Sequence, residues 1–307
     1  MMRRLARPLT HRRGFLTAAA GLLGVSALGG CDRFAVTPRG RQTLKLGEDA
    51  NLYVQRLLLT PASLAKEFPD SEISPWFKPN GTIDPQDRDY KALAARNFSD
   101  WRLRIDGLVE NPQALSLADL RALPARTQTT RHDCVEGWSA IGKWTGVPLA
   151  EVLKRAGLKP EARYIVFHCA DTMEFAMSGD TETANPDMTA RAEGEENQAS
   201  DSKAAGAEAP DADAPDSDTS KGTPIRYYES IDLTDAYHPQ TILAYDLNGK
   251  ALPVSNGAPL RLRVERQLGY KQAKYIQRIE VRDTLAGVGE GGGGYWEDRG
   301  YEWYAGI

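Results

Sequence analysis

A long acidic stretch divides the chain into two parts that must fold around it. Residues 180–222 contain twelve Asp or Glu residues and three Lys or Arg residues, a net charge of 3 − 12 = −9. The stretch has no aromatic residue and few β-branched ones, so it cannot bury enough apolar surface to offset the entropy lost on ordering. We therefore predict a disordered acidic insertion that interrupts one domain spanning residues 41–307.

The first thirty residues are predicted to be an export signal. Arg12 and Arg13 precede an uncharged run of seventeen residues, 14–30, which is rich in Ala, Gly and Leu. This run is short for a membrane span, which needs about 20 apolar residues, and an arginine pair before such a run is typical of a twin-arginine signal. An ordinary secretory signal and an uncleaved anchor are the alternatives. We therefore expect the protein in the periplasm.

A second prediction concerns Cys31, which directly follows this signal. Residues 28–31 read LGGC and resemble a lipobox, in which the cysteine is lipidated after cleavage. Lipidation of Cys31 would anchor the protein at the inner membrane. The alternative is a cleavage site with an incidental cysteine beside it.

Local patterns predict short strands and helices in the first part of the chain. Residues 101–107 alternate apolar and polar side chains and end in Asp-Gly, which indicates a half-buried strand and a turn. Apolar residues recur with helical spacing in 148–156, and Gly157 ends that helix. The other predicted elements are a short helix opened by Thr60-Pro61 and running through Phe68, a helix at 116–123 capped by Ser116, and a strand at 163–170 rich in β-branched and aromatic residues.

The second part of the chain carries the clearest strand signals. Residues 241–253 read as two strands joined by an Asn-Gly turn, a strong hairpin signal. In residues 260–264 apolar side chains alternate with Arg261 and Arg263, so both arginines should face one side of a strand. The glycine run at 291–294 is predicted to be mobile and is too simple to be a phosphate-binding loop.

One thiol stands in an unusually polar sequence, RHDCVEGWS at residues 131–139. Arg131 would favour the thiolate of Cys134, which is the form that attacks or binds metal, whereas burial would disfavour it. From these residues alone, Cys134 is a nucleophile, a soft-metal ligand or a buried small residue. A zinc site with His132, His168 and Cys169 is a further alternative, although their spacing is not the Cys-x-x-Cys of structural zinc sites.

Three motifs, taken in order, resemble the sulfite-oxidase superfamily of molybdopterin enzymes. RHDCVEGWS and the following WTGVPL at 144–149 are similar to the cysteine loop of that superfamily, while NGAPLR at 256–261 and LGYKQAK at 268–274 are similar to its two pterin-binding loops. The resemblance implies the superfamily's fold, an α+β, mixed and strand-rich single catalytic domain. It also implies a molybdenum–molybdopterin cofactor, with Cys134 as the one protein ligand to the metal, since soft thiolate sulfur suits such a centre.

The resemblance also implies roles for residues around the cofactor. Arg131 and His132 are catalytic candidates beside Cys134. Arg261 would offer a planar fork of donors, and Lys274 a compact positive charge, to the phosphate of the pterin. The complete set of cofactor-binding candidates is Asn51, Gln55, Cys169, Asn256, Arg261, Gln272, Ala273 and Lys274.

The implied function is oxo transfer by a molybdopterin-dependent oxidoreductase. We expect reduction of a sulfoxide or another small oxo-compound, because the full arginine set of sulfite oxidases is not found; a sulfite-type oxidase is the alternative. A non-catalytic molybdopterin carrier or sensor is an alternative of another class. No haem motif is present, so a membrane cytochrome is the expected electron partner. The net charge of −4 gives no reason to expect nucleic-acid binding, and we expect a monomer.

Overall fold

The computed structural model describes residues 37–60, 63–176 and 222–307. The predicted signal, Cys31 and all but the last residue of the acidic stretch lie outside these ranges. The predictions for these segments therefore stay predictions. Within the described ranges, no helix has the length and apolar character needed to cross a membrane.

Two sheets form the body of the molecule. The first has the strand order β2-β1-β10-β5-β6. Its strands are β1 (Leu103–Gly107), β2 (Gln113–Leu115), β5 (Tyr164–Ala176), β6 (Thr223–Asp232) and β10 (Ile276–Arg282). The second has the order β3-β4-β7-β8, with β9 paired to β7. Its strands are β3 (Arg126–Asp133), β4 (Ser139–Pro148), β7 (Ile242–Leu247), β8 (Lys250–Ala251) and β9 (Arg261–Arg263).

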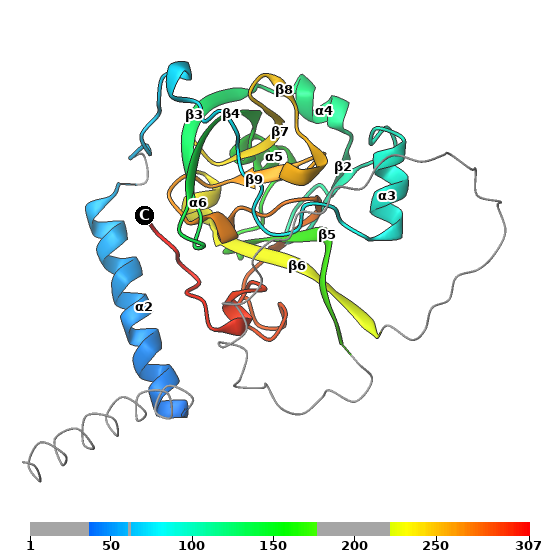
Figure 1. Ribbon diagram of the computed structural model, residues 1–307. Coiled ribbons are helices and arrows are strands. Elements are labelled where there is room, and N and C mark those ends of the chain that lie inside the picture. The colour runs from blue at the N-terminus through cyan, green and yellow to red at the C-terminus, as the bar shows by residue number, and fades with distance from the viewer. Residues whose placement is uncertain (1–36, 61–62, 177–221) are drawn as a thin grey trace, which may run out of the picture.

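Both sheets combine strands from the two sides of the acidic stretch. β10 lies parallel to β1 and antiparallel to β5, both of which precede that stretch. In the second sheet, β7, which follows the acidic stretch, pairs antiparallel with β4, which precedes it. Figure 1 shows the second sheet above β5 and β6, so the two parts of the chain build a common core.

One long helix and several short ones pack around these sheets. The α-helices are α2 (Pro38–Leu58), α3 (Arg88–Ala95), α4 (Leu117–Ala122), α5 (Leu149–Ala156) and α6 (Leu233–Ala236). Single 3₁₀ turns are η1 (Asp70–Glu72), η3 (Val254–Asn256), η4 (Gly269–Lys271) and η5 (Glu297–Arg299). The mixed, strand-rich α+β architecture predicted from the sequence is thus confirmed.

The elements with strong local signals form where the sequence predicts them. α5 buries all four residues of its apolar face, and Gly157 follows it with a positive φ of 66°. Ser116 and Asp119 form a reciprocal capping box at the start of α4. β1 and β5 occupy the predicted strand positions. The β7–β8 hairpin turns at Asn248-Gly249, both with positive φ.

The predicted helix from Thr60-Pro61 through Phe68 is wrong. Residues 63–68 have no helix, because their backbone instead runs along the edge of the second sheet, where the Phe68 amide donates to the carbonyl of Thr129. The helix in this region is α2, which ends just before Thr60-Pro61. A residue before proline is disfavoured in helical conformation, which fits this boundary.

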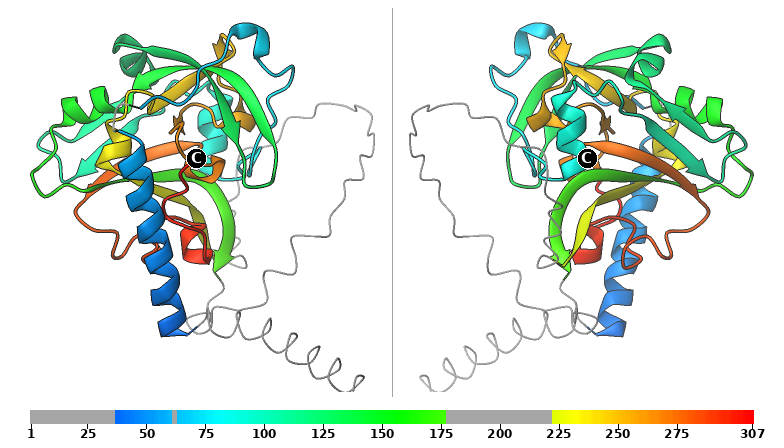
Figure 2. Two further views of the ribbon diagram at one scale, coloured as in Figure 1. Left: turned by 90° about the vertical axis from the view of Figure 1, so that its left-hand side faces the viewer. Right: turned by 90° about the vertical axis from the view of Figure 1, so that its right-hand side faces the viewer.

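The long helix α2 lies along one flank of the molecule and packs against the C-terminal residues (Figures 1 and 2). Arg56 of α2 pairs with Asp232 and Asp235, at 2.9 and 3.0 Å, and its guanidinium lies over the ring of Tyr304. Glu48 accepts a hydrogen bond from the backbone amide of Trp303. These contacts fix α2 as an outer element of the fold.

The glycine run at 291–294 is packed and hydrogen-bonded, which corrects the prediction that it is mobile. The amides of Glu290 and Gly292 donate to the two carboxylate oxygens of Asp298, at 2.8 and 2.6 Å. Gly294 lies so close to the carboxylates of Glu229 and Glu297 that a Cβ would collide with both. The glycines therefore allow the backbone to approach three acidic side chains closely.

Candidate active site

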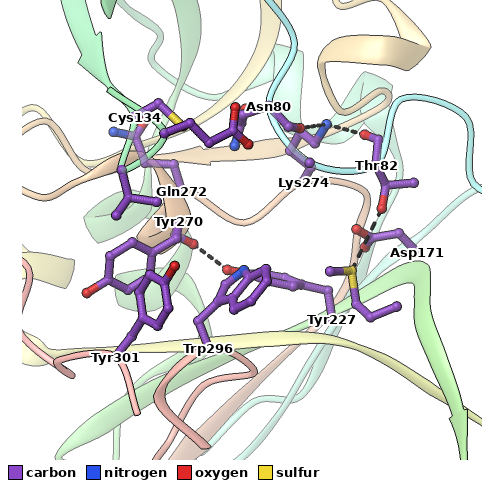
Figure 3. A pocket seen from close by; sticks show the side chains of 14 residues that line it. Asn80, Thr82, Cys134, Asp171, Tyr227, Tyr270, Gln272, Lys274, Trp296 and Tyr301 are labelled. Carbon is purple, nitrogen blue, oxygen red and sulfur yellow. Dashed lines mark hydrogen bonds between the residues drawn. The ribbon is translucent and has the colours of Figure 1, made fainter. Parts of the chain in front are cut away.

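A cavity of about 170 Å³ opens beside the cysteine loop (Figure 3). Segments distant in the sequence build its wall: the loop before α3, the turn after β3, the strands β5 and β6, the segment after β9, and the C-terminal aromatic segment. The lining residues are Asn80, Gly81, Thr82, Cys134, Val135, Glu136, Asp171, Met173, Tyr227, Tyr270, Gln272, Lys274, Trp296 and Tyr301.

Cys134 lines this cavity from the turn between β3 and β4. Its amide donates to the carbonyl of Trp138 at 2.9 Å, and the amide of Gly137 donates to the carbonyl of Cys134 at 3.0 Å. Burial raises the pKa of the thiol, while the backbone amides of Glu136 and Val135 oppose this rise. These amides give the sulfur a set of donors that favours the thiolate when a metal replaces the proton.

The side chain of Arg131 does not lie at the cavity. Because side chains alternate along β3, Arg131 points to solvent with 55% of its side chain exposed, and its Nε pairs with Asp133 at 2.9 Å. Arg131 is not among the main influences on the pKa of Cys134, whereas Lys78 is one of them and lowers it. Lys78 lies 4.0 Å from the carboxylate of Glu136. The structure thus corrects the expectation that Arg131 stabilises the thiolate.

His132 lies behind the cysteine turn, fully buried, and does not line the cavity. Arg263 donates from Nη1 to His132 Nδ1 at 3.0 Å. Burial, together with the positive charges of Arg263 and Arg261, holds the pKa of His132 well below its usual value. The imidazole is therefore neutral at physiological pH, so His132 supports the turn and is not an acid beside Cys134.

Arg261 and Arg263 face one side of β9, as predicted, and both are buried over the ring of Trp144, at 5.0 and 4.5 Å from its centroid. Arg261 joins the two loops that the sequence assigns to the pterin. It donates to the carbonyl of Asn256 at 3.0 Å and to that of Gln272 at 3.5 Å. Burial and Arg263 lower the pKa of Arg261 to about 9.

Lys274 and Gln272 line the cavity, as the sequence motif predicts for cofactor-binding residues. Lys274 donates to the carbonyls of Asn80, at 2.6 Å, and Thr82. Burial and the nearby Arg261 lower the pKa of Lys274 to about 7. Ala273, the next residue, is buried in the main core cluster, the group of apolar side chains that includes residues from both sheets. Its backbone carbonyl accepts a hydrogen bond from the amide of Leu262.

The loop that contains Asn256 needs a glycine at its next position. Gly257 has a φ of 111°, and a Cβ there would lie 3.0 Å from the side chain of Lys274 and 3.2 Å from that of Arg261. Glycine therefore lets the loop pass between the two cations. This is the physical reason for the Asn-Gly pair in the motif.

Six of the eight predicted cofactor-binding residues do not line the cavity: besides Asn256, Arg261 and Ala273, described above, these are Asn51, Gln55 and Cys169. Asn51 and Gln55 lie on α2, at the flank of the molecule, with Asn51 exposed. Cys169 is buried in the main core cluster, and burial raises its pKa well above the ordinary value. Among the described residues, no cluster of three or more His, Cys, Asp or Glu has a metal-binding arrangement, so nothing supports the zinc alternative.

Sequence reasoning missed several residues of the wall. Asn80 lines the cavity, whereas the predicted Asn51 does not, and Asp171 lies two residues beyond Cys169 on the same strand. Burial raises the pKa of Asp171 to about 6. Neither belongs to a local motif. The aromatic-rich sequence YWEDRGY at 295–301 is the one local signal for the lining residues Trp296 and Tyr301.

The residues around the cavity fit a polar, phosphate-bearing heterocycle with a soft metal. Four buried polar atoms at or beside it have no hydrogen-bond partner among the described residues: Asn80 Oδ1, Asp171 Oδ1, Asn256 Nδ2 and Arg261 Nε. Each such group costs about 1–3 kcal/mol when left unpaired. A ligand that carries donors, acceptors and an anionic end would satisfy them, and Cys134 would supply the thiolate.

Comparisons with known proteins agree with this site. The family described as "Oxidoreductase molybdopterin binding domain" matches residues 91–196 and 192–287. The putative protein-methionine-sulfoxide reductase subunit YedZ1 of Azospira oryzae is 34% identical over 300 residues, which cover 97% of this chain and 88% of the relative. The protein-methionine-sulfoxide reductase catalytic subunit MsrP of Xanthomonas campestris pv. campestris is 34% identical over 193 residues, 62% of this chain and 47% of that relative.

The chain thus spans about half the length of the MsrP relative. A solved structure, the sulfane dehydrogenase SoxCD from Paracoccus pantotrophus, matches with a TM-score of 0.40 and 22% identity, over 60% of this chain and 39% of that chain. The family match spans strands on both sides of the acidic stretch, and the YedZ1 relative aligns with 97% of the chain. The chain therefore belongs to the family of oxidoreductases with a molybdopterin-binding domain, and it has the mixed, strand-rich α+β architecture that its motifs predict.

Proposed function

We propose that this oxidoreductase holds a molybdenum–molybdopterin cofactor and reduces a sulfoxide. The observation that carries the proposal is the charge of the cavity at Cys134: of the described residues that line it, Lys274 is the one cation, while Glu136 and Asp171 are acidic. Such a wall suits a neutral, polar substrate. The names of the relatives YedZ1 and MsrP, which refer to protein-methionine-sulfoxide reduction, support the same substrate class.

The residues of the chain would position the reaction. When bound, the cofactor supplies the two-electron oxo chemistry. Cys134 would hold the metal, while Lys274 and Asn80 would bind the polar end of the pterin. The ring of Tyr301 contacts those of Tyr270 and Trp296. The three rings form an aromatic wall that suits the sulfur and methyl groups of a sulfoxide.

A sulfite-type oxidase is less well supported. Sulfite is a dianion, and its binding calls for several cations in the cavity wall. Lys274 itself has a pKa of about 7, so it carries only part of a charge at neutral pH. Arg261 and Arg263 are buried behind the wall and do not line the cavity.

The first test is the metal and pterin content of protein from a molybdenum-replete host, followed by single-turnover mixing of reduced protein with a sulfoxide. We expect near-stoichiometric molybdenum and oxidation of the metal by the sulfoxide. Cys134→Ser should abolish turnover while the pterin stays bound. Cys169→Ala, in the other described cysteine, is the matched control and should keep turnover. Zinc, or a metal that no sulfoxide oxidises, would contradict the proposal.

We further propose that the protein works in the periplasm and takes electrons from a membrane cytochrome. The relatives are named as subunits, one of them as a catalytic subunit, which supports an external electron donor. The Arg12-Arg13 signal and the lipobox at Cys31 support export and anchoring. Fractionation of cells, with mass spectrometry of the N-terminal peptide, tests both; unprocessed protein in the cytoplasm would contradict them.

A further inference from the structure

A buried cluster of charged residues stands directly behind the cavity wall. Lys271 Nζ lies 2.5 Å from a carboxylate oxygen of Glu229 and 2.5 Å from one of Glu297. The side chains of Lys271 and Glu229 are fully buried, and that of Glu297 is 2% exposed. These residues come from η4, β6 and η5, so the fold brings them together from three elements.

The cluster holds two carboxyl groups for one ammonium group. If all three were ionised, one negative charge would be left in the protein interior, which is costly. A proton on one carboxyl removes this cost. Burial, with the charge of Glu297, raises the pKa of Glu229 well above its ordinary value, whereas the pKa of Lys271 is raised by the two carboxylates despite burial. Glu229 is the more deeply buried of the two carboxyl groups and lies beside the hydroxyl of Tyr227, so we assign the proton to Glu229.

Tyr227 connects this proton to the cavity. Its hydroxyl lies 3.4 Å from Glu229 Oε2, and it donates to the backbone carbonyl of Tyr270. Both tyrosines line the cavity, and Figure 3 shows the hydroxyl of Tyr227 and the carbonyl of Tyr270 meeting in its wall. With Glu229 protonated, its O–H donates to Tyr227, whose own O–H donates to the carbonyl of Tyr270.

We propose that Glu229, held in place by Lys271 and Glu297, supplies a proton to the cavity through the hydroxyl of Tyr227. The inference rests on the proposed function, because sulfoxide reduction consumes protons: R₂SO + 2H⁺ + 2e⁻ gives R₂S + H₂O. The S–O bond breaks, two O–H bonds form, and an external reductant provides both electrons.

One of the two protons follows the relay and the other comes from solvent. As Tyr227 gives its proton to the departing oxygen, the Glu229 O–H bond breaks and the proton passes to Tyr227. Solvent then returns a proton to Glu229. The carbonyl of Tyr270 cannot relay the proton, so the hydroxyl of Tyr227 must turn from this carbonyl towards the oxygen in the cavity.

The titration of Glu229 depends on a small set of neighbours. Lys271 and Tyr270 face it from η4, Glu297 from η5, Cys169 from β5 and Tyr227 from its own strand. The amide of Ser230 also donates to Glu229 Oε1 at 2.7 Å. Of these groups, Lys271 is the one with a positive charge, and it is shared with Glu297.

Glu229→Gln tests the relay because the amide keeps the shape of the carboxyl group but cannot pass on its proton. A positioned proton donor typically contributes about 10²–10⁴-fold to a rate. We expect kcat for sulfoxide reduction to fall at least tenfold at pH 7, with KM and cofactor content unchanged. The wild-type kcat should be flat at low and neutral pH, whereas that of Glu229→Gln should keep rising as the pH falls.

Tyr227→Phe should give the same loss of kcat and of the flat pH profile. Tyr228→Phe is the matched control, because the neighbouring hydroxyl of Tyr228 binds Asp298 and does not line the cavity. It should leave the pH profile of the wild type intact. Equal pH profiles in wild type, Glu229→Gln and Tyr227→Phe would overturn the relay.

Infrared spectroscopy gives a readout that does not depend on activity. Wild-type protein at pH 7 should show the C=O band of a buried protonated carboxyl, which Glu229→Gln lacks and Glu265→Gln keeps. Glu265 is equally buried but pairs with Arg263 at 2.6 Å. Absence of the band overturns the relay alone. A wild-type protein that reduces no sulfoxide overturns the proposed function, and the relay with it.

Discussion

The cysteine turn shows how single positions on one strand take different roles. β3 sends Arg131 to solvent and His132 into the core, and the strand ends just before Cys134 at the cavity. The sequence placed all three near the metal because they are close along the chain. Successive side chains of a strand point to opposite faces, and this alternation sets the directions of the side chains of Arg131 and His132. The pairing of β3 with β4 is continuous and contains no proline, so the alternation is kept along the whole of β3.

Arg131→Ala should therefore have little effect. Its ion pair with Asp133 is exposed, and such pairs contribute about 0–1 kcal/mol. We expect turnover within about threefold of wild type and a similar thermal midpoint, since the side chain of Arg131 is exposed and does not line the cavity. Steady-state kinetics with metal analysis tests this. A loss of turnover as large as that of Cys134→Ser would place Arg131 back in the site.

Asp171 makes the cofactor-free protein sensitive to pH. Its pKa is raised from 3.8 to about 6. Between pH 3.8 and about pH 6, the folded protein therefore binds a proton at Asp171 that the unfolded chain does not bind. The contribution of this proton to the free energy of unfolding is complete below about pH 4 and is lost as the pH rises through about 6. Asp171→Asn resembles the protonated form, so at pH 7.5 it should increase the free energy of unfolding by up to about 3 kcal/mol.

Denaturant unfolding of cofactor-free wild type and Asp171→Asn at pH 4 and pH 7.5 checks this prediction. The difference should be small at pH 4. A gain of equal size at both pH values would show that packing, and not the charge of Asp171, is the cause. The same substitution should weaken retention of the cofactor, because a binding carboxylate is lost from the cavity wall.

At the scale of elements, the sequence predicts those features that depend only on residues close together in the chain. The capping box of α4, the apolar face of α5 and the Asn-Gly turn of the β7–β8 hairpin each involve residues a few positions apart. The stacking of Arg261 and Arg263 over Trp144 was not predicted, because it depends on β9 joining a sheet that contains β4. For the same reason, the contribution of Asn80 to the site was missed.

Leu153→Ala tests the packing of α5. Leu153 is fully buried in the main core cluster, and truncation of such a leucine costs about 2–5 kcal/mol. The exposed Lys154 on the same helix offers a control, and Lys154→Ala should change the unfolding free energy by less than about 0.5 kcal/mol. Equal losses in the two variants would contradict the assignment of the buried face.

At the scale of the molecule, the acidic stretch should be dispensable for folding. Ala176 and Thr223 pair directly across β5 and β6, although 222 − 176 = 46 residues lie between them. A short turn can therefore replace residues 177–222. The shorter loop should raise the free energy of unfolding by about 1–2 kcal/mol through loop entropy, and molybdenum content should be unchanged. A variant that loses the metal would show that the stretch contributes to the site.

The position of β10 between β1 and β5 has a consequence for how the protein is made. The ribosome synthesises β1 and β5 early, yet they cannot join the same sheet until residues 276–282 have appeared. Trp296 and Tyr301 complete the cavity later still. A nascent chain therefore has no finished place for a pterin until Tyr301 has emerged from the ribosome. Any transport that moved the chain during its translation would separate it from cytoplasmic cofactor before the binding site existed.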